Sequence, residues 1–217
     1  MVSRQLGLCA WSLRWCLAML LAAAFVGVAF AQEQRVVRVE EDWELVIDEP
    51  APDRNAPQVT TMFSPLDSPE GWLHATLDVN YQTLPDFSAG GMQLTVWHWY
   101  VPFREQVLPN YSYLANDGET VRWTQVMDLA DCGLIFEVIN GSSTTWGDFG
   151  GQGYLKKIIY TSLPSLNAYS PDISAAHSGV SYAGNRVKSL VLKRVRRTLD
   201  TEEVIEDTTE RVVHAQQ

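Results

Sequence analysis

The sequence predicts an all-β fold in which two antiparallel sheets form a β-sandwich. From Gln32 onward, apolar residues recur at every second position in short runs, which is the period of a strand rather than of a helix. Gly, Pro, Asn and Asp separate these runs. Seven or more short strands with no helix between them indicate a sandwich or a barrel.

The clearest predicted strand covers residues 72–81, where apolar residues such as Leu77 alternate with polar ones such as Asp78. One face of this strand is therefore expected in the core and the other in water. Asn116-Asp117-Gly118 predicts a hairpin between a strand at 111–115 and one at 119–129, because Asp-Gly tolerates positive φ. Further strands are expected near 43–47 and at 57–63, 92–101, 133–140, 154–161 and 187–196. The predicted core includes Trp43, Leu45, Ile47, Leu73, Leu77, Val79, Trp123 and Phe136.

The N-terminus has the pattern of an export signal. Arg4 and Arg14 precede an apolar run from Cys16 to Phe30, and Ala29-Phe30-Ala31 matches a signal-peptidase site. The run is shorter than the roughly 20 residues that a spanning helix needs, although an uncleaved membrane anchor is the alternative. We expect residues 1–31 to be a signal peptide and the mature protein to be secreted, periplasmic or on the cell-envelope exterior, without membrane insertion. Residues 32–198 are then one sandwich domain, and 199–217 a flexible acidic tail.

The charge pattern argues against a nucleic-acid partner. Loss of Arg4 and Arg14 from the 16 basic residues, with all 26 acidic residues kept, moves the net charge from −10 to −12, whereas nucleic acids select basic surfaces. The basic stretch 186–197 is interpreted as a strand with charges at its rim. The acidic segment after Leu199 is expected to be a loosely ordered tail, either free or folded back electrostatically on this basic strand. We expect it to be dispensable, so that truncation there changes stability by no more than about 1 kcal/mol.

Cysteine and histidine usage predicts neither a disulfide nor a metal site. Cys132 alone remains after signal cleavage, and its apolar neighbours indicate a small buried hydrophobe. The four histidines and this cysteine show no metal-ligand spacing. No metal or other cofactor is predicted.

The first candidate binding residues lie in MQLTVWHWYV, residues 92–101. Met92, Leu94 and Val96 form the aliphatic set of this strand, so Gln93, Thr95, Trp97 and Trp99 are expected on the opposite face. Side chains two residues apart on a strand are about 6.6 Å apart. Trp97 and Trp99 would then form a flat strip on which sugar rings stack, flanked by Gln93 and Thr95. In the alternative interpretation, a loop or the opposite sheet covers both tryptophans.

The second candidate is the segment NGSSTTWGDFGGQG, residues 140–153. Its glycines and hydroxyl residues indicate a surface loop, in which Trp146 would stack on a sugar and Asp148 would accept its hydroxyls. The alternative is a glycine-rich turn anchored by a buried Trp146. No Lys-Ser or Lys-Thr follows the glycines, which argues against a nucleotide site.

The sequence predicts no catalytic residue. Glycoside hydrolases need two carboxylates on one face, about 5 to 5.5 Å apart for retention or 6.5 to 9.5 Å for inversion. Asp42 and Glu44 share a strand face, but no strand repeats the E-x-D-x-x-E pattern that would supply the full set. Enzyme activity is therefore uncertain, and the pattern favours a binding protein.

The strand order, the segment VINGSSTTWGDFGG and the closing AGNRVKSLVLKRVR resemble secreted β-sandwich proteins of the concanavalin-like jelly-roll type, over Val36 to Arg197. This resemblance implies a jelly roll and no specific activity, since the fold family includes lectins, sugar-binding modules, glucanases and alginate lyases. The carboxylate and Arg/His/Tyr signatures of the enzymes are missing. Three functions follow: a non-catalytic carbohydrate-binding module, an envelope or extracellular-matrix structural or interaction protein, and a polysaccharide hydrolase or lyase. Exposure of Trp97 and Trp99 favours the first over the second, and a close carboxylate pair in a cleft favours the third.

Overall fold

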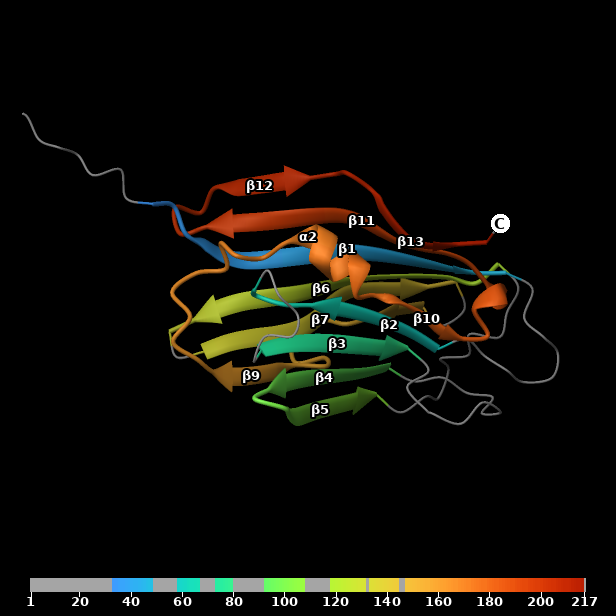
Figure 1. Ribbon diagram of the computed structural model, residues 1–217, viewed down its shortest axis with the longest axis horizontal. Helices are drawn as coiled ribbons and strands as arrows, with labels where there is room; N and C mark the ends of the chain where they lie inside the picture. Colours follow the sequence, from blue (N-terminus) through green and yellow to red (C-terminus); the bar gives the residue numbers. More distant parts are fainter. Residues whose placement is uncertain are drawn as a thin grey trace, which may run out of the picture. The chain divides into compact units, whose positions relative to one another are not determined.

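Two antiparallel sheets pack face to face in the computed structural model, which describes residues 33–48, 58–66, 73–79, 92–107, 118–131, 133–144 and 147–216 (Figure 1). Among these residues, sheet A has eight strands: β1 (Val36–Ile47), β6 (Thr120–Ala130), β7 (Gly133–Ser143), β8 (Gly147–Phe149), β9 (Lys157–Tyr160), β11 (Val187–Leu199), β12 (Val204–Asp207) and β13 (Arg211–Ala215). Sheet B has five: β2 (Gln58–Phe63), β3 (Leu73–Val79), β4 (Met92–His98), β5 (Val101–Val107) and β10 (Gly179–Tyr182). The predicted all-β sandwich is confirmed.

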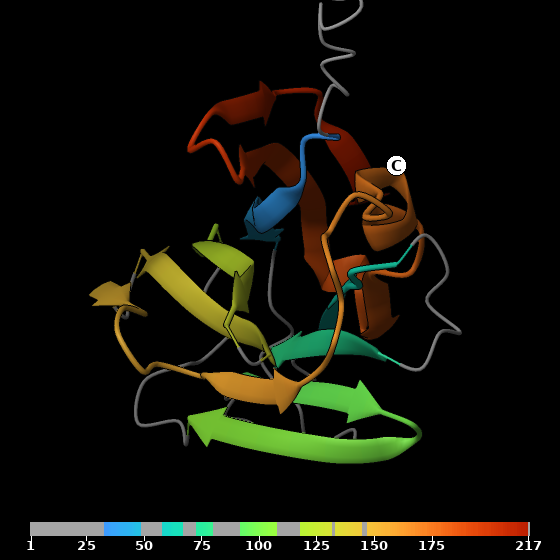
Figure 2. The same ribbon diagram turned by 90° about the vertical axis from the view of Figure 1, so that its left-hand side faces the viewer.

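The chain crosses between the two sheets from β1 to β2, from β5 to β6, from β9 to β10 and from β10 to β11. Sheet A runs β12-β11-β1-β6-β7-β8, with β13 also paired to β11 and β9 also paired to β7, while sheet B runs β10-β2-β3-β4-β5. The two layers are visible end-on in Figure 2, with the green strands of sheet B below those of sheet A. A short helix, α2 (Pro171–Ala176), and a 3-10 turn (Gly184–Arg186) lie between β9 and β11 in the chain.

The core lies between the sheets and contains every predicted core residue. Trp43 of β1 stacks on Trp123 of β6 with 6.4 Å between ring centroids, and Phe63 of β2 meets Phe136 of β7 edge-on at 5.3 Å across the layers. The predicted residues that are buried are Trp43, Leu45, Ile47, Leu73, Leu77, Val79, Trp123 and Phe136. Alternation was a reliable guide because each strand has one face against the other sheet.

A buried polar cluster interrupts this apolar core, and the sequence did not predict it. The carboxylate of Glu41, which is 1% exposed, accepts hydrogen bonds from Trp43 Nε1 at 2.9 Å, Gln125 Nε2 at 2.6 Å and the Tyr169 hydroxyl at 2.7 Å. Gln125 Oε1 in turn accepts the Thr61 hydroxyl from sheet B at 2.8 Å. The cluster therefore connects both sheets and the segment that leads to α2.

The prediction of one strand over 92–101 was wrong. β4 ends at His98, the chain reverses through Trp99 and Tyr100, and β5 begins at Val101. Both turn residues have positive φ, 50° and 66°, as a type I′ hairpin turn requires. The alternation concealed the turn because Trp and Tyr are also good strand residues. Pro102 was the missed signal, since proline in a sheet is confined to edge positions.

The segment after Leu199 is part of sheet A, whereas the sequence predicted a flexible tail over 199–217. β12 pairs with β11 from Thr198↔Val204 to Val195↔Asp207, and β13 pairs with the earlier part of β11. Its acidic residues supply ion pairs to basic strand β11, including Lys193–Glu210 and Arg194–Glu206. The charge asymmetry between the two segments is therefore cross-strand complementarity.

Several predictions lie outside the described residues. These are the signal peptide at 1–31, the strand at 111–115 with most of its hairpin turn, Cys132 and Trp146. In the described part of the chain, no helix has the length and apolar character to cross a membrane.

Candidate functional site

The outer face of sheet A carries rows of charged side chains, because the even positions of β1 point away from the core. Cross-strand pairing places Glu44 opposite Arg122 of β6, Arg122 opposite Ser142 of β7, and Ser142 opposite Asp148 of β8. These four residues form one row across four strands. At about 4.8 Å per strand spacing, the row is about 14 Å long.

Ion pairs connect neighbouring strands along this face. Arg122 contacts Glu44 Oε2 through Nη2 at 2.6 Å and Nε at 2.8 Å. Arg194 of β11 contacts Asp42 Oδ2 through Nη2 at 2.6 Å and Nε at 2.7 Å, and the Thr124 hydroxyl donates to Asp42 Oδ1. Hydrogen bonding to Asp42 and its charge raise the pKa of Arg194 above its usual value. Asp42 thus has a donor on each of its oxygens, whereas the contacts of Glu44 within the described residues are to Oε2.

A β-bulge on β11 brings a second cation to this face. Asp42 pairs with Arg194 and Trp43 pairs with Leu192, so Lys193 is an extra residue with no partner in β1. A bulge re-aims side chains locally and often occurs beside functional sites. Lys193 and Arg194 consequently line the same cavity.

A second bulge lies across the sheet, on β7. Arg122 pairs with Ser142 and Thr124 with Ile139, so Asn140 and Gly141 together lie opposite Trp123. Asn140 has a φ of 51°, in the left-handed region that asparagine tolerates better than most residues. A Cβ on Gly141 would lie 2.2 Å from the ring of Phe149, so any larger residue here would have to displace that ring.

Between the two bulges, the outer face of sheet A is hollowed into a groove. One cavity of about 470 Å³ extends from Lys193 and Arg194 to Asn140 and Ser142. A second cavity, of about 350 Å³, shares Asn140 and Ser142 and reaches the loop at 148–151. We call the two together the sheet A groove. Of the predicted site residues, Asp148 lies in it.

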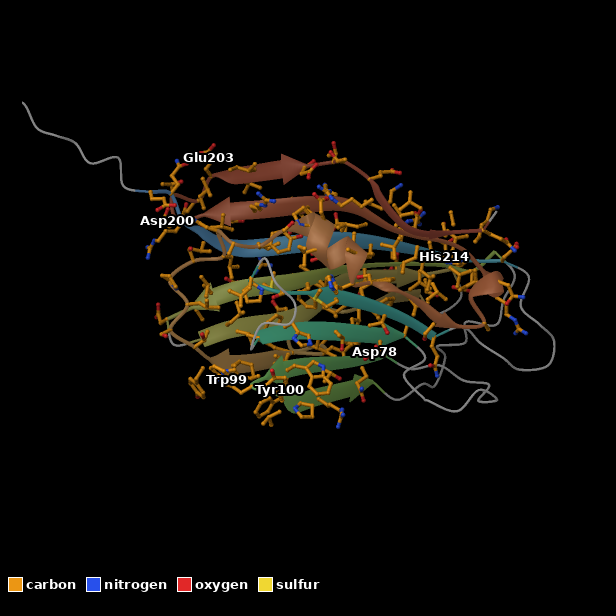
Figure 3. The ribbon with its side chains drawn as sticks, in the orientation of Figure 1. Asp78, Trp99, Tyr100, Asp200, Glu203 and His214 are labelled. Atoms are coloured by element: carbon orange, nitrogen blue, oxygen red, sulfur yellow. The ribbon has the colours of Figure 1, made fainter. Side chains whose placement is uncertain are left out.

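The other described candidates lie on sheet B. The register confirms that Gln93, Thr95 and Trp97 share its outer face, but Thr95 is 2% exposed, and Gln93 donates to its hydroxyl at 3.1 Å. Trp97 is half-buried and stacks on His74 with 6.2 Å between centroids. Trp99 lies in the turn between β4 and β5 (Figure 3). The predicted flat strip of Trp97 and Trp99 therefore does not form.

The turn is the most exposed aromatic part of the described chain. Trp99 is 63% exposed and Tyr100 is 88% exposed, and the edge strand that follows them adds exposed Val101 and Phe103. We call these four residues the hairpin patch. Two neighbouring residues with positive φ that are neither Gly nor Asn store backbone strain.

The chemistry of the two surfaces differs. The sheet A groove offers carboxylate, amide, hydroxyl and guanidinium groups, which suits a ligand rich in hydrogen-bonding atoms. Asp42 and Glu44 are the paired carboxylates that the sequence singled out, and both line the groove. A glycosidase needs one carboxyl that donates a proton, whereas the oxygens used here accept from arginine and threonine. Within the described residues, no group of three His, Cys, Asp or Glu has a geometry that could hold a metal ion.

No family model matches this sequence, and searches of curated proteins and of solved structures found no match either. Arg122 and Arg194 were not predicted as site residues, and Asn140 lies in the predicted segment 140–153 without having been given a role there. Alternating charges at 38–44 were a visible signal for the polar face, but the bulges that hollow it depend on pairing between distant strands.

Proposed function

We propose that this protein is a secreted, non-catalytic glycan-binding protein with a concanavalin-like jelly-roll sandwich, and that the sheet A groove is its binding site. The observation that carries the proposal is the groove between two β-bulges, where Lys193 and Asn140 are turned toward the same hollow. Glycans present hydroxyls that both donate and accept hydrogen bonds. The groove supplies both kinds of partner along a row of about 14 Å.

The groove suits a chain-like ligand better than a small compact one. It crosses β11, β1, β6, β7 and β8, and its two cavities share Asn140 and Ser142. Binding without catalysis fits the carboxylates, because Asp42 and Glu44 accept guanidinium hydrogen bonds instead of presenting a carboxyl proton. This moves the site from the aromatic face of sheet B to the opposite sheet.

A glycan array with the full-chain protein and its Asn140→Gly variant tests the proposal. Glycine tolerates the φ of 51° at this position, so the variant should fold normally and lose only the amide. We expect affinity for the bound glycans to fall roughly two- to tenfold, the value of one or two neutral hydrogen bonds. Trp99→Ala is the control, and it should bind as the wild type does.

The opposite pattern would contradict the location of the site. If Trp99→Ala abolishes binding and Asn140→Gly does not, the hairpin patch is the glycan site. If no glycan binds the wild type, the function proposed here is wrong.

The hairpin patch favours a second candidate function, an interaction protein, because exposed contiguous apolar groups are typical of contact surfaces. In that case Tyr100→Ser should reduce concentration-dependent association in sedimentation experiments.

A further inference from the structure

Of the described residues, four basic and three acidic ones line the sheet A groove. The side chain of Arg122 is 60% exposed and that of its partner Glu44 is 20% exposed, and for Arg194 and Asp42 the values are 38% and 22%. In each pair the carboxylate lies deeper and the guanidinium lies nearer to solvent. Lys193 and Arg196 also line the groove, but Lys193 is paired with Glu210, and Arg194 also contacts Glu206 at 3.6 Å; these two carboxylates are more exposed than their basic partners. Over β1 and β6, a ligand that enters the groove therefore meets the guanidinium of Arg122 first, although the whole chain has a net charge of −10.

Some N–H donors of the arginines that line the groove have no acceptor among the described residues. Arg122 has five N–H groups. Within the described residues, its Nε and Nη2 atoms both contact one acceptor, Glu44 Oε2. In the described part of the chain, its Nη1 edge therefore has no partner. Arg196 contacts Glu40 and Asp42 through Nη2, while its Nε is buried without a partner among the described groups. Both oxygens of Asp42 are already used.

We propose that the ligand of the sheet A groove is an acidic glycan, whose carboxylate or sulfate groups bind the exposed edge of Arg122. This inference rests on the proposed function and names its ligand class. Arginine binds oxyanions through two parallel N–H groups, and such charge-assisted bonds are about twice as strong as neutral ones. Asn140, Ser142 and Asp148 would bind the hydroxyls of the same polymer.

Titration calorimetry with the full-chain protein tests the ligand class. The probes are polygalacturonate for carboxylate groups, dextran sulfate for sulfate groups, dextran as a neutral glycan, and polyglutamate as an anionic polymer without sugars. We expect one or both acidic glycans to bind, with affinity that falls as ionic strength rises. The acidic polymer that binds more tightly identifies the anionic group. Dextran and polyglutamate should bind at least tenfold more weakly.

Arg122→Gln tests the site, and Arg35→Gln is its matched control. Arg35 is 50% exposed and pairs with Asp200 at 2.9 Å, so its replacement makes the same charge change outside the groove. We expect Arg122→Gln to weaken acidic-glycan binding about tenfold or more and Arg35→Gln to change it less than twofold. The double variant Arg122→Gln/Glu44→Gln restores the net charge and should remain weak, because the N–H donors of the arginine are still missing.

Each other outcome overturns part of the argument. If dextran binds as tightly as the acidic glycans, groove binding of glycans stands and the acidic class is wrong. Equal binding of polyglutamate, recovery of affinity in the double variant, or an equal loss in Arg35→Gln would each show a nonspecific electrostatic effect and overturn the inference. If neither neutral nor acidic glycans bind, the proposed function fails together with it.

Discussion

Glu41 shows how one buried side chain can make the stability of the fold depend on pH. Burial, which is only partly offset by hydrogen bonds from Tyr169, Trp43 and Gln125, raises the pKa of Glu41 above its ordinary value of 4.5. The folded state therefore binds this proton more tightly than the unfolded state does. Its contribution to stability is greatest below about pH 4.5 and is lost as pH rises through the folded pKa.

We therefore expect Glu41→Gln to change the pH dependence of stability. The amide cannot ionise, so the advantage of wild type over the variant should increase as pH falls from 7 toward 4.5. Urea unfolding at several pH values measures this difference.

Asp207→Asn is a useful comparison, because hydrogen bonds from Thr209 and Arg211 lower the pKa of Asp207 to about 2. The stabilising contribution of Asp207 is present above pH 3.8 and is lost as pH falls toward 2. The difference in free energy of unfolding between wild type and Asp207→Asn should therefore change between pH 3.8 and 2, below the range in which Glu41 acts. A pH-independent difference for Glu41→Gln would contradict the argument.

Two phenylalanines provide a matched test of packing. Phe136 is fully buried between the sheets, whereas Phe103 on β5 is 41% exposed. Phe136→Ala should lower the free energy of unfolding by about 3 to 5 kcal/mol, the usual cost of emptying an aromatic core site. Phe103→Ala should cost clearly less in the same denaturant titration. Equal costs would show that the edge between β5 and its neighbours is packed as tightly as the core.

At the scale of elements, the β4–β5 hairpin uses residues that its turn disfavours. A type I′ turn prefers Asn-Gly, and L-residues other than Gly, Asn and Asp in the left-handed region cost about 1 to 2 kcal/mol each. Trp99→Asn/Tyr100→Gly should therefore raise the free energy of unfolding by about 1 kcal/mol or more, measured by thermal or urea unfolding. A loss of stability would mean that the aromatic side chains pack on the sheet.

The C-terminal strands lead to a different expectation from the flexible tail predicted from sequence. Arg211 of β13 contacts Asp172 of α2 and Asp207 of β12, and His214 contacts the Val187 carbonyl. Truncation after Leu199 removes these contacts and exposes the edge of β11. We expect it to lower the free energy of unfolding by more than about 1 kcal/mol, whereas removal of Gln217 alone should not. A truncated chain with wild-type stability would restore the dispensable-tail prediction.

At the scale of the whole molecule, the two sheets share one core. Thr61 of sheet B donates to Gln125 of sheet A, Phe63 meets Phe136 across the interface, and the buried apolar residues form one cluster. We expect the sandwich to unfold in one cooperative step, with coincident transitions by tryptophan fluorescence and far-UV circular dichroism. Separate midpoints would show that sheet A and sheet B unfold independently.

The alternation of apolar and polar residues by itself determined the fold class and most of the core. Leu73 to Val79, Trp43 and Phe136 were predictable because a strand buries one face, so their burial follows from local order in the chain. The same pattern placed Asp42 and Glu44 together on the outer face. It also placed Gln93, Thr95 and Trp97 on one face of β4, although it did not reveal that Thr95 is buried.

Only the tertiary structure decided where the hollow surface lies. The sheet A groove depends on two β-bulges, at Lys193 where β11 pairs with β1 and at Asn140 where β7 pairs with β6. Strand register is a property of a pair of strands and not of one strand alone. The turn at Trp99-Tyr100 and the docking of β12 and β13 on β11 likewise depend on which strands become neighbours. Local propensity carries no information about that choice, because the same residues favour a strand in either arrangement.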